Sequence, residues 1–307
     1  MDYSVIGKKI RELRKVVGLT QGDLAEGVCT QALVSRIEKG DIYPSATALY
    51  QISLKLGVDV NYFFEIGTTP RLDYIREVEK QLRFFRLNGK YDEMMEMVKT
   101  EEKNPLFYKD NEKLQLLLWH KAIYLFEIEK DPDRAFSLLQ EAYELTANQK
   151  KAASEREMEI LTTFGTWESI LDNHEKALLH YYKVEDMMNQ TEQLFDKSIK
   201  TRLFFNTARV LTRLNRYEES IDYCRRAIKW CLEEEHLWGL GELHYQIGYN
   251  FELLGDYEKA LPYIEKSIHM FELRKSERFT SFLENKRKEI SMKATQARGT
   301  GTPAHNK

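Results

Sequence analysis

The stretch LTQGDLAEGVCTQALVSRIEKG, residues 19–40, contains two helix-start signals only ten residues apart. Thr20 is a favourable N-cap residue and is followed three positions later by the acid Asp23. Thr30 repeats this signal ahead of QALVSRIEKG, which Gly40 can close. The stretch therefore predicts two short helices joined by a tight turn.

The second of these helices has two different faces. Leu33, Val34 and Ile37 fall on one side of a helical wheel and form an apolar stripe. The opposite side is polar or small and carries Gln31, Ala32, Ser35, Arg36 and Lys39. The apolar stripe predicts packing against the rest of a domain, and the polar side is left to face a partner.

The sequence on either side completes a small helical domain. Residues 5–18 read VIGKKIRELRKVVG and predict a basic amphipathic helix that ends at Gly18. After the quoted stretch, Pro44 offers a helix start and Gly57 a stop, and a last short helix follows. We expect five short helices in residues 1–66, arranged as a helix-turn-helix whose second helix enters the major groove of DNA.

These positions resemble the signature of the lambda-repressor (Cro/C1 or XRE) family. The resemblance implies that Gln31 and Arg36 read base edges and that Gln21 holds a phosphate. A glutamine can pair bidentately with adenine and an arginine with guanine, whereas short polar, lysine and tyrosine side chains suit phosphate oxygens. The expected DNA-binding residues are Gln21, Thr30, Gln31, Ser35, Arg36, Lys39 and Tyr43.

Composition sets the broad class of the protein. The chain has 307 residues, of which 42% are hydrophobic and 31% charged, and it has only six prolines, so we expect two domains and almost no sheet. It has no long apolar run and no leader-like N-terminus, which predicts a cytoplasmic protein without a membrane span. The net charge is −3, and residues 1–66 carry eight Lys and Arg against eight Asp and Glu, so DNA binding depends on where the charges lie.

The long C-terminal part repeats itself. Beyond an expected linker at residues 67–75, five turn-then-helix segments align on Met94, Ala135, Ala177, Ser220 and Ala260, at intervals of 41, 42, 43 and 40 residues. Together with small or apolar residues twelve positions upstream, this is the tetratricopeptide pattern with longer helices. We expect an all-α chain in which residues 76–275 form five helix pairs in a right-handed superhelix, followed by a capping helix at 276–291 and a disordered tail at 292–307.

The first helices of such repeats line a concave groove. Arginines, amides and aromatic residues dominate the positions expected to face it, and these groups can hold the carboxylates, backbone amides and apolar side chains of an extended peptide. The expected peptide-binding residues are Arg83, Tyr124, Arg202, Phe205, Asn206, Arg209, Glu242, Tyr245, Gln246 and Tyr249.

A lambda-repressor-like domain followed by five long repeats resembles the peptide-sensing quorum regulators of Gram-positive bacteria, the Rap/Rgg/NprR/PlcR/PrgX group, and among these the PlcR type. The resemblance covers residues 1–290. It implies a homodimeric transcription factor that binds a short, secreted and re-imported peptide, with Asn206 and Gln246 among the peptide contacts. Because one recognition helix covers few base pairs, we also expect two copies to act together on an inverted-repeat operator.

Other functions stay open at this point. The repeats could bind a partner protein in place of a peptide, or serve only for dimerisation in a constitutive repressor. The histidines lie outside nucleophile and zinc motifs, and the three cysteines lack metal-ligand spacing, so we expect no enzyme activity, metal or cofactor. A redox role for Cys29, the operator, the peptide and the sign of regulation cannot be read from the sequence.

Overall fold

The structure is a computed structural model that describes residues 3–69, 71–147 and 152–299, and this part of the chain is helical without strands. The all-α fold class is therefore confirmed. Cα packing divides the chain into two units, Met1–His120 and Lys121–Lys307. The first unit holds α1 Tyr3–Val17, α2 Gln21–Ala25, α3 Gln31–Lys39, α4 Ala46–Leu56, α5 Val60–Thr68, α6 Leu72–Leu87, α7 Tyr91–Glu101, α8 Pro105–Tyr108 and most of α9 Asn111–Tyr124.

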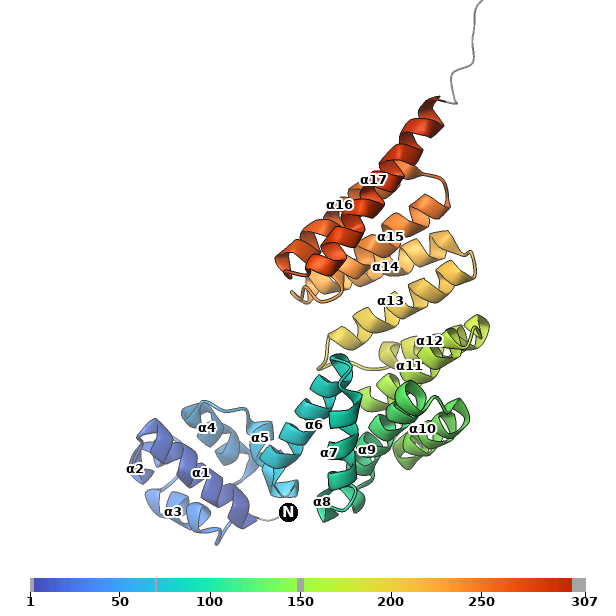
Figure 1. Ribbon diagram of the computed structural model, residues 1–307. Helices are drawn as coiled ribbons and strands as arrows, with labels where there is room; N and C mark the ends of the chain where they lie inside the picture. The colour runs from blue at the N-terminus through green and yellow to red at the C-terminus, as the bar shows by residue number, and fades with distance from the viewer. Residues whose placement is uncertain (1–2, 70, 148–151, 300–307) are drawn as a thin grey trace, which may run out of the picture. The chain divides into compact units, whose positions relative to one another are not determined.

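Five short helices, α1–α5, form the N-terminal domain as expected (Figure 1). Their apolar faces meet in one core, in which Ile6, Ile10, Leu24, Val34, Ile37, Leu49, Ile52 and Phe63 are almost completely buried. Helices α1 and α3 approach closely at Gly7, where an added Cβ would lie 2.0 Å from the Ile37 carbonyl oxygen. Only glycine fits at this contact.

The local signals of the quoted stretch are confirmed. The Thr20 hydroxyl accepts from the Asp23 amide while the Asp23 carboxylate accepts from the Thr20 amide, a complete capping box. Thr30 caps α3 by accepting from the Leu33 amide. Gly40 ends α3 with φ of 82°, in the left-handed region that favours glycine.

The expected linker at residues 67–75 is mostly helical, because α5 continues to Thr68 and α6 begins at Leu72. Leu72 belongs to the same buried cluster as the core of α1–α5, and Glu65 of α5 pairs with Arg76 of α6. These contacts support helix at positions where the Gly, Thr and Pro content suggested a loop. Pro70 itself lies outside the described residues.

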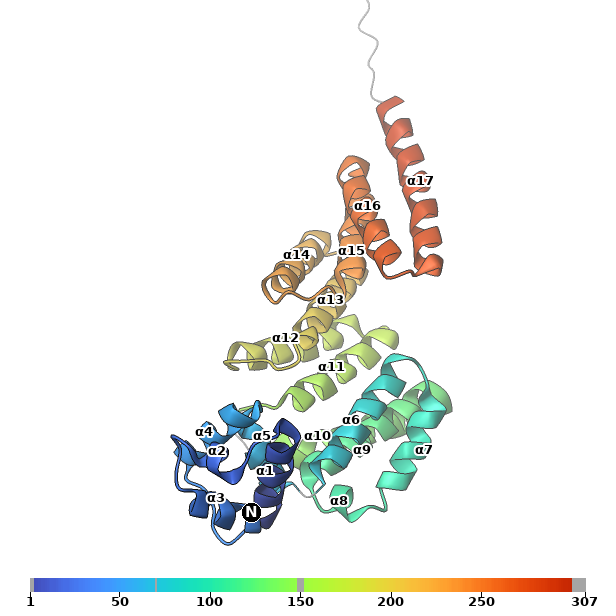
Figure 2. The same ribbon diagram turned by 90° about the vertical axis from the view of Figure 1, so that its left-hand side faces the viewer.

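The second unit continues with helix pairs. It holds the end of α9, a π-helical turn at Leu125–Glu129, α10 Pro132–Ala147, α11 Glu155–Ile170, α12 His174–Asn189, α13 Ser198–Arg213, α14 Tyr217–Glu233, α15 Leu240–Leu253, α16 Tyr257–Leu273 and α17 Glu277–Gly299. Successive helices from α10 to α17 pack on one another, as Figures 1 and 2 show. Within the described residues, α6/α7, α9/α10, α11/α12, α13/α14 and α15/α16 are the five expected pairs. The handedness of their superhelix stays a prediction.

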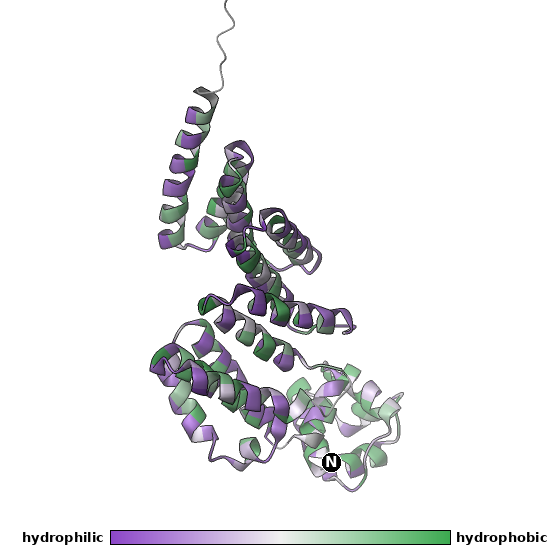
Figure 3. Ribbon diagram, turned by 90° about the vertical axis from the view of Figure 1, so that its right-hand side faces the viewer, coloured by the Kyte–Doolittle hydropathy of each residue, from purple (hydrophilic) through white to green (hydrophobic). Residues whose placement is uncertain are grey.

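The aligned repeat positions are packing positions. Ala135, Ala177, Ser220 and Ala260 are all 0% exposed. The upstream positions are equally tight, since a Cβ added at Gly165 would lie 2.4 Å from the Tyr181 ring. Hydrophobic and hydrophilic residues alternate within the turns of the repeat helices in Figure 3, as expected when one face of each helix is buried.

The C-terminal helix corrects one boundary. We expected the capping helix to end at residue 291 and a disordered tail to follow, but α17 continues to Gly299. Lys293 forms ion pairs with Glu252 of α15 and Glu289 of α17, which hold this extension against the preceding helices. The remaining tail, residues 300–307, lies outside the described residues.

Candidate functional site

The polar face of α3 is open at its central positions. Gln31, Arg36 and Lys39 are exposed, while Ser35 is half-buried. Neither Arg36 nor Lys39 has an ion-pair partner within the described residues. The two cations and the amide of Gln31 therefore present donors to solvent on one helix, as a recognition helix requires.

A chain of hydrogen bonds to other residues of the domain fixes the position of the Gln31 side chain. Gln31 Nε2 donates to Gln21 Oε1 at 3.0 Å, and Gln21 Nε2 donates to Glu38 Oε2 at 2.8 Å. Arg14 of α1 donates to both carboxylate oxygens of Glu38, at 2.5 and 3.0 Å, and to the Leu19 carbonyl at 2.7 Å. Three helices thus fix the side chain that is expected to read a base.

Glu38 is the anchor of this chain. Its side chain is only 2% exposed and that of Arg14 only 11%. Burial by itself raises the pKa of a carboxyl, but the hydrogen bonds from Arg14 and Gln21 outweigh it and hold the pKa of Glu38 below its ordinary 4.5. Glu38 is ionised at neutral pH, and its charge is used inside the domain. The sequence did not indicate a role for Arg14 or Glu38, because each is one of several charged residues on an amphipathic helix and their pairing across 24 positions is tertiary.

The other expected DNA-binding residues lie around this face. Thr30 and Gln21 are at the N-termini of α3 and α2, where backbone N–H groups suit phosphate. Tyr43 is half-buried in the loop after α3. The end of α2 is held by Lys55 of α4, whose ammonium donates to the Asp23 and Glu26 carbonyls.

Cys29 lies in the turn between α2 and α3. Burial raises the pKa of its thiol above the ordinary 9.0, against the smaller opposing effect of Lys55. A raised pKa reduces the thiolate fraction at neutral pH, which is the reverse of what a redox-sensing cysteine needs.

The second unit contains a cavity of about 430 Å³ between α13 and α15. Four of the expected peptide-binding residues line it, namely Arg209, Tyr245, Gln246 and Tyr249. The two tyrosine rings are stacked, with centroids 5.9 Å apart. The Tyr245 hydroxyl is a proton donor at neutral pH, and burial raises its pKa further above the ordinary 10.0. The remaining lining residues, which sequence reasoning missed, are Thr212, Arg213, Asn215, Tyr217 and Leu253.

A buried polar cluster lies beneath this cavity. Gln246, which is only 5% exposed, donates to the Thr212 hydroxyl at 2.7 Å. Thr212 bonds Asn250 at 2.7 Å and Ser220 at 2.9 Å, and Asn250 donates to Ser220 at 2.7 Å. The cluster therefore joins α13, α14 and α15. Gln246, which was expected among the peptide contacts, lines the cavity and at the same time donates from its Nε2 to this cluster.

The other expected peptide-binding residues are not all gathered at the cavity. Asn206 contacts the Thr166 hydroxyl at 3.5 Å, and Arg202 pairs with Glu159 at 2.7 Å. Glu242 pairs with Arg274 at 2.7 Å. Phe205 lies under the guanidinium of Arg209, with 5.8 Å between that group and the ring centroid. Arg83 is on α6 in the first unit and Tyr124 is at the end of α9, both half-buried.

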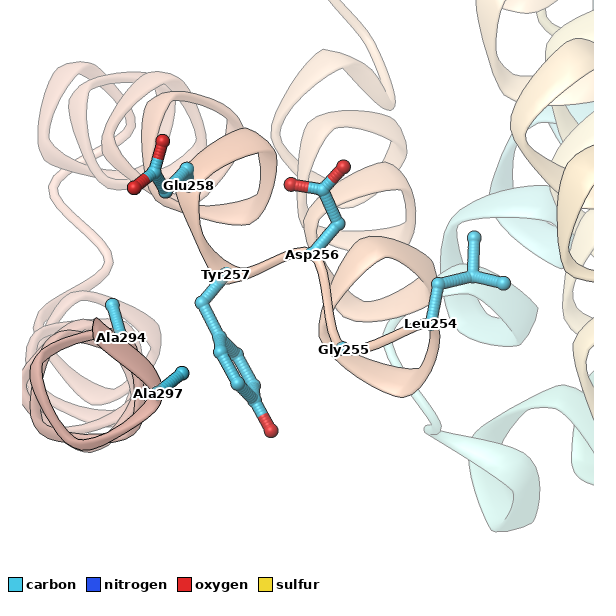
Figure 4. A pocket seen from close by; sticks show the side chains of 7 residues that line it. All are labelled: Leu254, Gly255, Asp256, Tyr257, Glu258, Ala294 and Ala297. Carbon is cyan, nitrogen blue, oxygen red and sulfur yellow. The ribbon is translucent and has the colours of Figure 1, made fainter. Parts of the chain in front are cut away.

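Two further cavities contain none of the expected site residues. One, of about 400 Å³, lies where the α15–α16 turn faces α17, and Figure 4 shows the Tyr257 ring extending between Ala297 and the turn at Gly255. The other, of about 500 Å³, lies among α14, α15 and α16 beside Arg225, Lys229 and Lys266. Among the described residues, no cluster of His, Cys, Asp and Glu has the geometry to hold a metal, and no helix is long and apolar enough to cross a membrane.

Two models of known protein families match successive parts of the chain. Residues 10–63 match the helix-turn-helix family model, and residues 80–290 match the model of the RNPP family C-terminal domain. No curated protein sequence matches the chain.

Three solved structures illustrate the likeness of the fold. Bacillus thuringiensis PlcR, in complex with the peptide PapR7 and DNA, has a TM-score of 0.79 at 22% identity, covering 91% of this chain and 99% of that one. ComR of S. thermophilus, in complex with DNA and its signalling peptide ComS, has a TM-score of 0.61 at 15% identity over 93% and 99%. The Streptococcus dysgalactiae SHP pheromone receptor Rgg2 has a TM-score of 0.61 at 14% identity over 92% and 99%.

Proposed function

Since the chain belongs to the RNPP family, whose C-terminal domain model matches residues 80–290, we propose that it is a peptide-responsive transcription regulator. Its helix-turn-helix binds an operator, and its repeats bind a short re-imported signalling peptide that controls DNA binding in quorum sensing. The observation that carries the proposal is the joint presence of the two matched domains on one chain. The solved PlcR and ComR complexes, which hold both a peptide and DNA, support it. The proposed activity is binding in the cytoplasm and involves no catalysis.

On the DNA side, Gln31 and Arg36 read bases, while Gln21, Thr30, Ser35, Lys39 and Tyr43 contact the phosphate backbone. The exposure of Gln31 and Arg36 on one face of α3 supports this division. Selection of binding sites from random DNA by the full-length protein tests it. An enriched inverted repeat with half-sites about 34 Å apart, or a multiple of that distance, is the expected result.

On the peptide side, the centre of the site is formed by Asn206, Arg209, Tyr245 and Gln246. Three of these four residues, Arg209, Tyr245 and Gln246, line the cavity between α13 and α15, and this supports their place in the proposed site. Native mass spectrometry of the full-length protein mixed with extract of its source cells tests whether a peptide is retained. Asn206→Ala should lose that peptide and its effect on DNA affinity, because an unpaired backbone group in a desolvated site costs about 1–3 kcal/mol. Retention of a protein and no peptide contradicts the proposal.

The repeats also hold two chains together as a homodimer, so that two helix-turn-helix domains act on one operator. Sedimentation of the full-length protein at micromolar concentration tests this. A monomer with and without operator DNA is the contradicting result.

A further inference from the structure

Two cations without an acidic partner line the cavity between α13 and α15. Arg209 and Arg213 lie one helical turn apart, both are exposed, and neither forms an ion pair within the described residues. No Asp or Glu is among the residues that line this cavity. Like charges four residues apart on a helix destabilise it, so the arrangement favours an anion between them.

Three other arginines of the α13/α14 pair differ from these two. Their guanidinium groups are already paired with carboxylates, in the pairs Arg202–Glu159, Arg216–Glu219 and Arg226–Glu185. Arg225 of α14 also lacks an ion pair within the described residues, but it lines the separate cavity among α14, α15 and α16. Within the cavity between α13 and α15, Arg209 and Arg213 are thus the cations available to a charged ligand group.

The α15 side of the cavity suits an apolar group attached to that anion. Tyr245 and Tyr249 present stacked rings, and Leu253 continues this side one turn further along α15. Thr212 of α13 and Gln246 of α15 also line the cavity, and their hydrogen bond of 2.7 Å supplies polar atoms to it. The cavity thus offers two guanidinium forks on one side and ring faces on the other.

We infer that this cavity is a carboxylate subsite of the proposed peptide site: Arg209 and Arg213 bind one carboxylate of the peptide, and Tyr245 and Tyr249 cover the apolar side chain beside it. The inference rests on the proposed function and adds the charge of the ligand and Arg213 as a specificity residue. The carboxylate can be the free C-terminus of the peptide or an Asp or Glu side chain.

Two pools of short random peptides, one with free C-terminal carboxylates and one with C-terminal amides, distinguish these sources. Full-length protein is incubated with each pool, and the retained peptides are identified by mass spectrometry. Enrichment confined to the free-acid pool indicates the terminal carboxylate, and enrichment of Asp or Glu in the amide pool indicates a side chain. Either result supports the subsite, with an expected preference of about tenfold or more over peptides without a carboxylate.

Arg213→Gln should abolish this preference, whereas Arg278→Gln removes the same charge from an exposed position on α17 and should leave it unchanged. Peptides retained without regard to carboxylates, or an unchanged preference in Arg213→Gln, overturn the subsite while leaving peptide binding intact. Retention of no peptide from either pool overturns the proposed function together with the subsite.

Discussion

Replacing Glu38 with alanine should destabilise the helix-turn-helix domain by about 3–5 kcal/mol, the effect of removing one partner from a buried ion pair. The Glu38 side chain is 2% exposed and that of Arg14 11%, so the Arg14 guanidinium would remain in a largely buried site with the Leu19 carbonyl as its remaining hydrogen-bond acceptor within the described residues. Gln21 would lose its acceptor as well. This loss is a large fraction of the roughly 5–15 kcal/mol that stabilises a typical domain.

Hydrogen–deuterium exchange of the full-length protein measures this change locally, through the opening free energies of amides in α1–α5. Glu12→Ala is the matched control, because it removes an acid that pairs with Lys9 at the surface, with side chains 65% and 28% exposed. Surface pairs of this kind contribute about 0–1 kcal/mol. An equal effect of the two substitutions would refute the anchoring role of Glu38.

The pH dependence provides a second check on the same residue. The folded protein lowers the pKa of Glu38 below 4.5, so its contribution is complete above that pH and is lost as the pH falls through the folded-state pKa. The difference between wild type and Glu38→Ala should therefore be constant from about pH 7 to pH 5 and shrink in stronger acid. A difference that grows on acidification contradicts this assignment.

Three further predictions concern other parts of the chain. Gln31→Ala or Arg36→Ala should weaken binding to the selected operator by about 1–3 kcal/mol and leave binding to random DNA nearly unchanged, as measured by fluorescence anisotropy; equal losses on both would exclude base reading. Gly165→Ala should destabilise the repeats by about 1–3 kcal/mol, because its Cβ would lie 2.4 Å from the Tyr181 ring, and urea unfolding followed by tryptophan fluorescence would reveal an unchanged midpoint if the contact relaxes freely. Asn250→Ala should cost about 1–3 kcal/mol by removing one buried hydrogen-bond partner from each of Thr212 and Ser220, and normal amide protection in α13–α15 would contradict this.

The sequence determined the features that depend on neighbours along the chain. The sequence alone predicts the capping residues Thr20 and Thr30, the glycine that ends α3, and the helix pairs that recur about every forty residues. These signals are local, because a cap acts within one turn and an amphipathic stripe recurs with the helical period. The family resemblance drew on the same positions, and the matches to the helix-turn-helix and RNPP models confirm it.

Tertiary structure decided which polar groups remain available to a partner. Glu38 pairs with Arg14 across 24 positions, and Arg202 with Glu159 across 43, so both charges are used inside the protein. Gln246 forms a hydrogen bond with Thr212 in a buried cluster. Arg213, which the sequence did not mark as a site residue, lines a cavity that has no Asp or Glu in its lining. A helical wheel assigns a side chain to one face of its own helix. It does not show which groups of the neighbouring helix lie opposite that side chain. Desolvation and pairing across helices, which set the charge and accessibility of each group, arise only when the helices pack.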